Sequence, residues 1–188
     1  MSTSTELTNG VSQSYTKALL GLEVLCEALE FITESQDGLA DFSESDLTNA
    51  LIEVTTIETV SPLEQSSLIE SARECWVDYG DQRDEWEDHP YGLAGWWVEQ
   101  QLEIVLVGRR SLTSTRYEDY GQAETSAVEL LLAFGGPTVR LTFDCFGGDG
   151  ANPGAKLSVN WGENETTHPY LPQLARAVSS LLSDLGDF

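Results

Sequence analysis

The sequence TVRLTFDC at residues 138–145 carries the clearest structural signal of this chain. In an extended strand, side chains point alternately to opposite faces, so Val139, Leu141, Phe143 and Cys145 would share one face. The polar residues between them would share the other face. This alternation predicts a strand with one buried and one solvated side.

Further strands are predicted on both sides of this segment. Residues 128–134 precede it across a short glycine-proline turn, and residues 155–161 follow it after a glycine-rich loop. The apolar run at 102–107 predicts an earlier strand, which could be entered through Trp96-Trp97-Val98. Residues 109–125 fit either a strand or a long loop. Successive strands joined by short connections predict an antiparallel meander.

The part of the chain before these strands has helical periodicity. Apolar residues recur at spacings of three and four over residues 12–36 and 44–59. A third helix is predicted to begin at Ser61-Pro62-Leu63-Glu64, because this sequence combines a capping box with proline at the first helical position. Gly80 is its expected C-cap.

These elements predict an α+β fold, in which N-terminal helices precede an antiparallel β-meander and a C-terminal helix. We expect a loose N-terminus over residues 1–11, a helical part over 12–95, and a sheet with the final helix over 96–188. The final helix is expected to begin near Pro169 or Pro172. The helical part and the sheet are expected to form one compact unit.

Charge is the most unusual feature of the composition. The chain has 32 acidic residues against 9 basic ones, a net charge of −23, and its lysines are Lys17 and Lys156. Affinity for phosphate needs clustered Lys and Arg, so nucleic acid and anionic membranes are disfavoured as direct partners. The cluster of Arg109, Arg110 and Arg116 is too small for nucleic acid and suits pairing with the chain's own acids or an oligomer contact. Cations and basic proteins are favoured as partners.

The sequence predicts a cytoplasmic protein without membrane association. Its start lacks the basic and apolar regions of a signal peptide, and no stretch approaches the roughly 20 apolar residues that span a bilayer. Cys26, Cys75 and Cys145 are odd in number, far apart and set in apolar patterns. They are therefore expected to be buried thiols in a reducing compartment.

The first predicted helix carries a ladder of carboxylates. Glu23, Glu27, Glu30 and Glu34 are spaced four, three and four residues apart, which keeps them on one side of a helix. No Lys or Arg lies within four residues of any of them. Like charges at this spacing cost about 0.2–0.5 kcal/mol per pair, so the arrangement carries a small, repeated penalty.

A second ladder follows the third helix and the segment after it. It comprises Glu70, Glu74, Asp78, Asp81, Glu85 and Asp88, spaced four, four, three, four and three, and is thickened by Asp84 and Glu87 with Trp86 among them. Gly80 could end the helix and turn the later members elsewhere, and Arg73 and Arg83 could neutralise part of the ladder. A solvated helix face would show a similar pattern of charge.

Carboxylates at this spacing offer negative charge at intervals of the same order as a nucleic-acid backbone. In composition and carboxylate spacing, the chain resembles DNA-mimic inhibitors, which include certain antirestriction and anti-CRISPR proteins of phages and plasmids. The resemblance implies an inhibitor that occupies the basic nucleic-acid-binding surface of a nuclease or CRISPR effector. Both ladders, with Trp86, are then the expected partner-binding residues. No motif ties the chain to a particular family.

Two other functions fit the composition. One is a generic cytosolic protein adapted to high salt, and the other is a metal-dependent or carboxylate acid–base enzyme. Asp84, Glu85, Asp88 and His89 lie close in sequence but lack the spacing of a known metal motif. No local pattern marks a nucleophile. The sequence therefore predicts no catalytic residue, no metal site and no cofactor, and it leaves the oligomeric state open.

Overall fold

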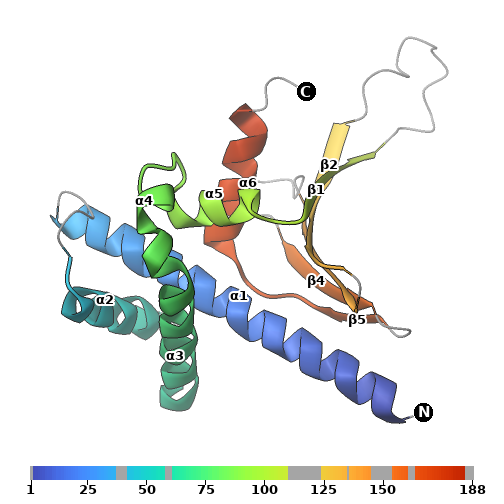
Figure 1. The fold of residues 1–188 in the computed structure, drawn as a ribbon, viewed down its shortest axis with the longest axis horizontal. Coiled ribbons are helices and arrows are strands. Elements are labelled where there is room, and N and C mark those ends of the chain that lie inside the picture. Colours follow the sequence, from blue (N-terminus) through green and yellow to red (C-terminus); the bar gives the residue numbers. More distant parts are fainter. Residues whose placement is uncertain are drawn as a thin grey trace. The chain divides into compact units, whose positions relative to one another are not determined.

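The computed structural model describes residues 2–36, 42–57, 61–109, 124–134, 136–144, 154–160 and 164–184. Helices come first, followed by a five-stranded antiparallel sheet and a C-terminal helix (Figure 1), so the predicted α+β fold is confirmed. By its internal contacts the chain divides into two units. The helical unit is Gln13–Trp97, and the sheet unit combines Met1–Ser12 with Val98–Phe188.

The sheet is a meander in which each strand pairs with the next one along the chain. Its strands are β1 (Glu103–Arg109), β2 (Glu124–Ala133), β3 (Thr138–Asp144), β4 (Ala155–Asn160) and β5 (Asn164–Thr167), in that spatial order. The first four correspond to the predicted strands. The sequence did not indicate β5, because NETT has no apolar alternation, and its pairing with β4 is what defines it. The part of residues 109–125 left open by the sequence lies mostly outside the described residues.

The register explains why one face of the sheet is buried. Leu130, Leu141 and Leu157 lie opposite one another on β2, β3 and β4, and all three are fully buried. The neighbouring row, Glu129, Thr142 and Lys156, points to the other face. The predicted alternation of β3 is therefore confirmed within its described residues. Helix α6 (Pro172–Asp184) belongs to the same unit and buries an apolar stripe of its own, comprising Leu174, Ala175, Ala177 and Val178.

The other helices are α1 (Ser2–Gln36), α2 (Glu44–Ile57), α3 (Pro62–Tyr79), the 3-10 turn η1 (Gly80–Gln82), α4 (Arg83–Trp86) and α5 (Gly92–Glu99). Two expectations were wrong here. The N-terminus is helical from Ser2 rather than loose, and Thr8 and Ser12, one turn apart on α1, are buried. A helix in a folded protein depends more on tertiary packing than on composition, so the polar composition of residues 1–11 did not reveal this helix. Trp96-Trp97-Val98 lies in α5 and not in a strand.

The start of α3 has the predicted capping box. The backbone N–H of Glu64 donates to Ser61 Oγ at 3.4 Å, and the backbone N–H of Ser61 donates to Glu64 Oε2 at 3.1 Å. Hydrogen bonds from the Ser61 side chain and backbone hold the pKa of the Glu64 carboxyl below its ordinary value. These bonds satisfy donors that a helix start otherwise leaves open.

Close packing of α1 on α3 depends on a glycine. A Cβ on Gly21 would lie 2.6 Å from Ser71 Cβ and 2.7 Å from the Ser71 carbonyl carbon, so the two helices would have to separate. Gly21→Ala is therefore expected to lower the free energy of unfolding by about 1–3 kcal/mol, measured by urea denaturation. A Cβ on Gly10, in the same helix, would meet nothing within 4 Å. Gly10→Ala should instead stabilise by about 0.5–1 kcal/mol. Equal effects of the two changes would contradict the close approach.

Candidate functional site

An exposed row of carboxylates follows α3, η1 and α4. We call it the α3–α4 acidic row, and its members are Glu70, Glu74, Asp78, Asp81, Asp84, Glu85 and Asp88, all of them exposed. Glu70, Glu74 and Asp78 lie on one side of α3 at successive turns. Ser71, Ala72 and Cys75 of the same helix are buried.

The row passes through Gly80 without a reversal of the chain. Gly80 is right-handed helical, with φ −63° and ψ −35°, and its N–H donates to the carbonyl of Trp76. The regular helix nevertheless ends at Tyr79, and the 3-10 turn leads directly into α4. The predicted interruption at Gly80 is therefore a change from α-helix to 3-10 turn. Asp81 lies on that turn, and Asp84 and Glu85 lie on α4.

Few basic side chains of the described residues form ion pairs with the α3–α4 acidic row. Lys17 Nζ lies 3.5 Å from Glu74 Oε2, with both side chains about half exposed, which is a surface pair of small net energy. Arg73 donates to Thr48 Oγ1 at 3.2 Å and so points toward α2. No ion pair within the described residues involves Glu70, Asp78, Asp81, Asp84, Glu85 or Asp88.

Arg83 engages Glu87, the residue expected to thicken the ladder. Its Nε lies 2.9 Å from Glu87 Oε2 and its Nη2 lies 3.3 Å from Oε1, a forked contact within one helical turn. The Arg83 guanidinium also lies 4.7 Å from the centre of the Phe42 ring. Glu87 is half-buried and already neutralised in this way, so it differs from the exposed members of the row.

The first ladder is not a uniform surface. Glu30 and Glu34 are exposed and Glu27 is half-buried, but Glu23 is only 5% exposed. The expectation that Glu23 lies on a partner-binding surface is corrected by this burial. The physical reason is that residues Leu22–Cys26 of α1 are buried on every side of the helix, and a spacing of three and four does not report whether neighbours cover a face.

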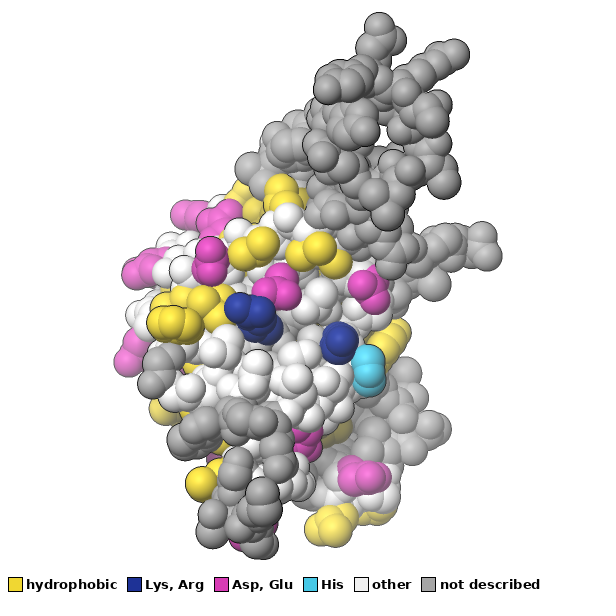
Figure 2. Space-filling view, turned by 90° about the vertical axis from the view of Figure 1, so that its right-hand side faces the viewer, with side chains coloured by type: hydrophobic (Ala, Val, Ile, Leu, Met, Phe, Trp, Pro, Cys, Tyr) yellow, Lys and Arg dark blue, Asp and Glu magenta, His cyan; other side chains and the backbone are white. Residues whose placement is uncertain are grey.

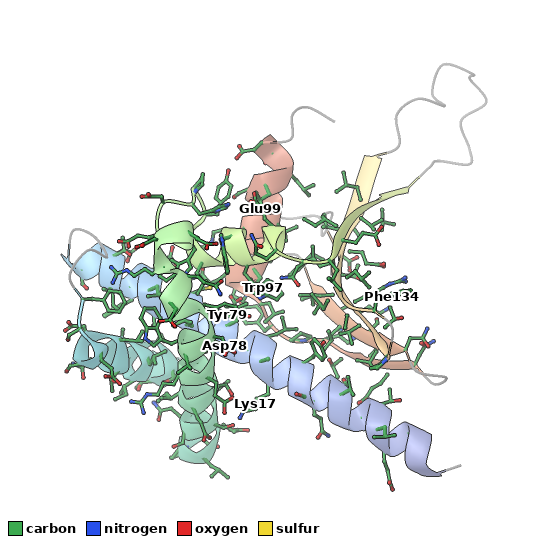
Figure 3. All side chains as sticks on the ribbon, viewed as in Figure 1. Lys17, Asp78, Tyr79, Trp97, Glu99 and Phe134 are labelled. Carbon is green, nitrogen blue, oxygen red and sulfur yellow. The ribbon has the colours of Figure 1, made fainter. Side chains whose placement is uncertain are left out.

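Trp86 is likewise not available to a partner, because its side chain is 1% exposed. Its Nε1–H donates to the carbonyl of Tyr79 at 2.9 Å, and its ring meets Trp76 edge-on at 6.3 Å. Figure 3 shows Asp78 and Tyr79 at the end of α3 nearest α4 and α5. There Trp97 Nε1–H donates to the Tyr79 hydroxyl at 3.2 Å. This aromatic cluster fixes the segment that carries the acidic row.

Two buried thiols lie beneath the carboxylates. Burial, followed by the charges of Glu23, Cys75 and Glu30, raises the pKa of the Cys26 thiol well above its usual value. Burial, followed by Asp78 and Glu74, raises the pKa of Cys75 to about 11. Both thiols are free, and Cys75 Sγ lies 3.6 Å from the carbonyl oxygen of Ala18. Cys145 lies outside the described residues.

The chain matches no family model, and no similar protein was found among curated proteins or solved structures. What it does must therefore be inferred from its own residues.

His89, which lies close in sequence to Asp84, Glu85 and Asp88, has a structural role in the turn before α5. The backbone N–H of Tyr91 donates to His89 Nδ1 at 3.2 Å, and a Cβ on Gly95 would meet the imidazole at 2.6 Å, so the ring packs into the turn before α5. No group of three or more His, Cys, Asp or Glu side chains in the described ranges could hold a metal ion. None of the helices described has the length and apolarity to cross a bilayer.

The sequence analysis did not predict that the apolar side chains of β1 are exposed. Four consecutive apolar residues there, Ile104–Val107, are exposed. A strand with one covered and one solvated face would show alternating apolar and polar residues. Ile104–Val107 show no such alternation, and this was the signal in the sequence that could have indicated an unusual strand.

Proposed function

We propose that this chain binds a basic protein surface through the α3–α4 acidic row and there takes the place of a nucleic acid. The observation that supports this is a series of exposed carboxylates along α3, η1, α4 and the turn after α4, most of which have no cation within the described chain. A net charge of −23 adds a long-range field of the same sign.

The spacing of the row is compatible with such a partner. Residues four apart on a helix rise by about 6 Å, against about 3.4 Å between phosphates of one DNA strand. Arginine side chains that normally hold phosphates can accept carboxylates in the same forked geometry. The rigid attachment of the row to α3 and to the aromatic cluster means that little order has to be created on binding.

The residues proposed to make the contact are fewer than the sequence predicted. They are Glu70, Asp78, Asp81, Asp84, Glu85 and Asp88, with Glu74 shared with Lys17. Glu30 and Glu34 are exposed and extend the same charge on α1. Buried Glu23 and Trp86 are excluded from direct contact, and paired Glu87 is expected to contribute little.

Competition with DNA tests this proposal. A restriction endonuclease and a guide-loaded CRISPR effector would each be incubated with fluorescent duplex DNA, and displacement by this protein followed by fluorescence anisotropy. We expect displacement that weakens steeply between about 50 and 200 mM salt, because the contact is electrostatic. Absence of displacement from both, or displacement that does not depend on salt, would argue against the proposal.

A stability measurement separates this function from salt adaptation. A protein adapted to molar salt should unfold as salt is lowered to physiological strength, because its carboxylates then repel one another. A nucleic-acid mimic has to remain folded there. Circular dichroism during salt dilution distinguishes the two cases, and unfolding near physiological salt would favour salt adaptation.

A further inference from the structure

Two aliphatic side chains of α3 are exposed beside the carboxylates of the α3–α4 acidic row. Leu63 is 83% exposed and Val77 is 75% exposed. Residues seven apart lie on nearly the same side of a helix, so Leu63, Glu70 and Val77 share one side of α3. Glu74, one turn before Val77, lies on that side too. The outer side of α3 therefore combines apolar and acidic side chains.

Val77 has a small cost at its position in the helix. Scattered apolar residues are ordinary on protein surfaces. A β-branched side chain, however, loses rotamer freedom in a helix, which costs about 0.5 kcal/mol relative to alanine. Since Val77 is 75% exposed, its burial in the folded chain recovers little of this cost. Such a residue suits a contact that is made with another molecule.

The exposed face of the sheet has a different character. Arg140 and Lys156 project from β3 and β4 on the face opposite the buried leucines, and Arg140 Nε lies 3.2 Å from Glu129 Oε1. Figure 2 looks onto the side where the sheet lies and shows basic side chains there, with acidic side chains scattered singly. A basic partner is therefore better suited to α3 than to this face.

Duplex and single-stranded nucleic acids present different surfaces to a protein. A duplex keeps its bases stacked inside and is gripped mainly through its phosphates. A single strand exposes apolar base faces between its phosphates, and the proteins that hold it combine a basic groove with aromatic side chains on which the bases stack. A surface that imitates a single strand therefore needs apolar side chains among its negative charges.

We propose that the outer side of α3, with Leu63 and Val77 among the carboxylates, occupies a groove that normally holds single-stranded nucleic acid. This inference rests on the proposed function and names the class of its partner. The carboxylates would meet the basic side chains of the groove, and the two aliphatic side chains would meet its aromatic ones. Leu63 and Val77 lie about 21 Å apart along the helix, within a groove that holds several nucleotides.

Displacement of fluorescent oligo(dT) from an OB-fold single-strand-binding protein, followed by fluorescence anisotropy, tests this inference. We expect the parental chain to displace the oligonucleotide. The double variant Leu63→Ala with Val77→Ala should need about a tenfold higher concentration, because the apolar contacts are lost. Both side chains are exposed, so this variant should fold as the parental chain does. Its salt dependence should be unchanged, since no charge is removed.

Two controls accompany this measurement. Leu7→Ala with Ile52→Ala truncates aliphatic side chains on α1 and α2 that are 54% and 46% exposed, and should displace oligo(dT) as the parental chain does. In the second control, a restriction endonuclease holds duplex DNA, and there the Leu63 and Val77 variant should act like the parental chain.

The outcomes separate this inference from the proposed function. Displacement of duplex DNA but not of oligo(dT) would overturn the inference alone. Equal losses for the variant in both assays, or no loss in either, would do the same. If the parental chain displaced neither nucleic acid, the proposed function would fail together with this inference.

Discussion

Replacing Trp86 with alanine is expected to lower the free energy of unfolding by about 3–5 kcal/mol. The side chain is 1% exposed, packs edge-on against Trp76 and donates a hydrogen bond to the Tyr79 carbonyl. Truncation would leave a cavity and a carbonyl without its donor. Since whole domains are stable by only about 5–15 kcal/mol, this single change should remove much of the stability of the helical unit.

Urea denaturation followed by circular dichroism measures this effect. Trp86→Phe retains most of the buried volume and should cost clearly less than alanine. Val77→Ala, at a side chain 75% exposed on α3, should change stability by no more than about 0.5 kcal/mol. A loss below about 1 kcal/mol for Trp86→Ala would mean that this tryptophan is not a core residue, and its exposure to a partner would have to be reconsidered.

Neutralising part of the acidic row should weaken binding to a basic target by about 10- to 100-fold. The variant combines Glu70→Gln, Asp78→Asn and Glu85→Gln, which keep side-chain size and remove three exposed charges. At up to about 1 kcal/mol per exposed charge pair, three lost pairs correspond to this range. Fewer like charges also reduce self-repulsion, so the variant should stay folded.

The matched control changes the same residue types away from the row. Glu44→Gln, Glu53→Gln and Asp144→Asn remove the same net charge from exposed positions on α2 and β3. If the row is the contact surface, the control should keep most of the affinity in the DNA displacement assay. Equal losses in both variants would show that net charge, and not the arrangement on α3 and α4, governs binding.

Local sequence signals predicted the local features of this fold well. The capping box at Ser61 and Glu64 and the alternation of β3 depend on residues within a few positions of one another, and both are present. β5 and the first turns of α1 could not be predicted in this way. Strand β5 is defined by its pairing with β4. The first turns of α1 bury the polar residues Thr8 and Ser12, which no apolar pattern marks.

The candidate site shows the same limit. Helical spacing put Glu70, Glu74 and Asp78 on one side of α3, where all three are exposed. Equivalent spacing on α1 included Glu23, which is buried, because periodicity identifies a side of a helix but not what covers it. Trp86, expected to contact a partner, is buried for a related reason. Its neighbours in sequence are charged, yet its ring turns inward to a carbonyl seven residues earlier.

The buried thiols have a practical consequence for chemical labelling. With a pKa of about 11, only about one Cys75 side chain in ten thousand is a thiolate at pH 7. Alkylating reagents attack the thiolate, so Cys75 should react very slowly in the folded protein, and Cys26, whose pKa is also raised, should behave in the same way. A cysteine introduced at an exposed position can then carry a fluorophore or spin label in preference to these two.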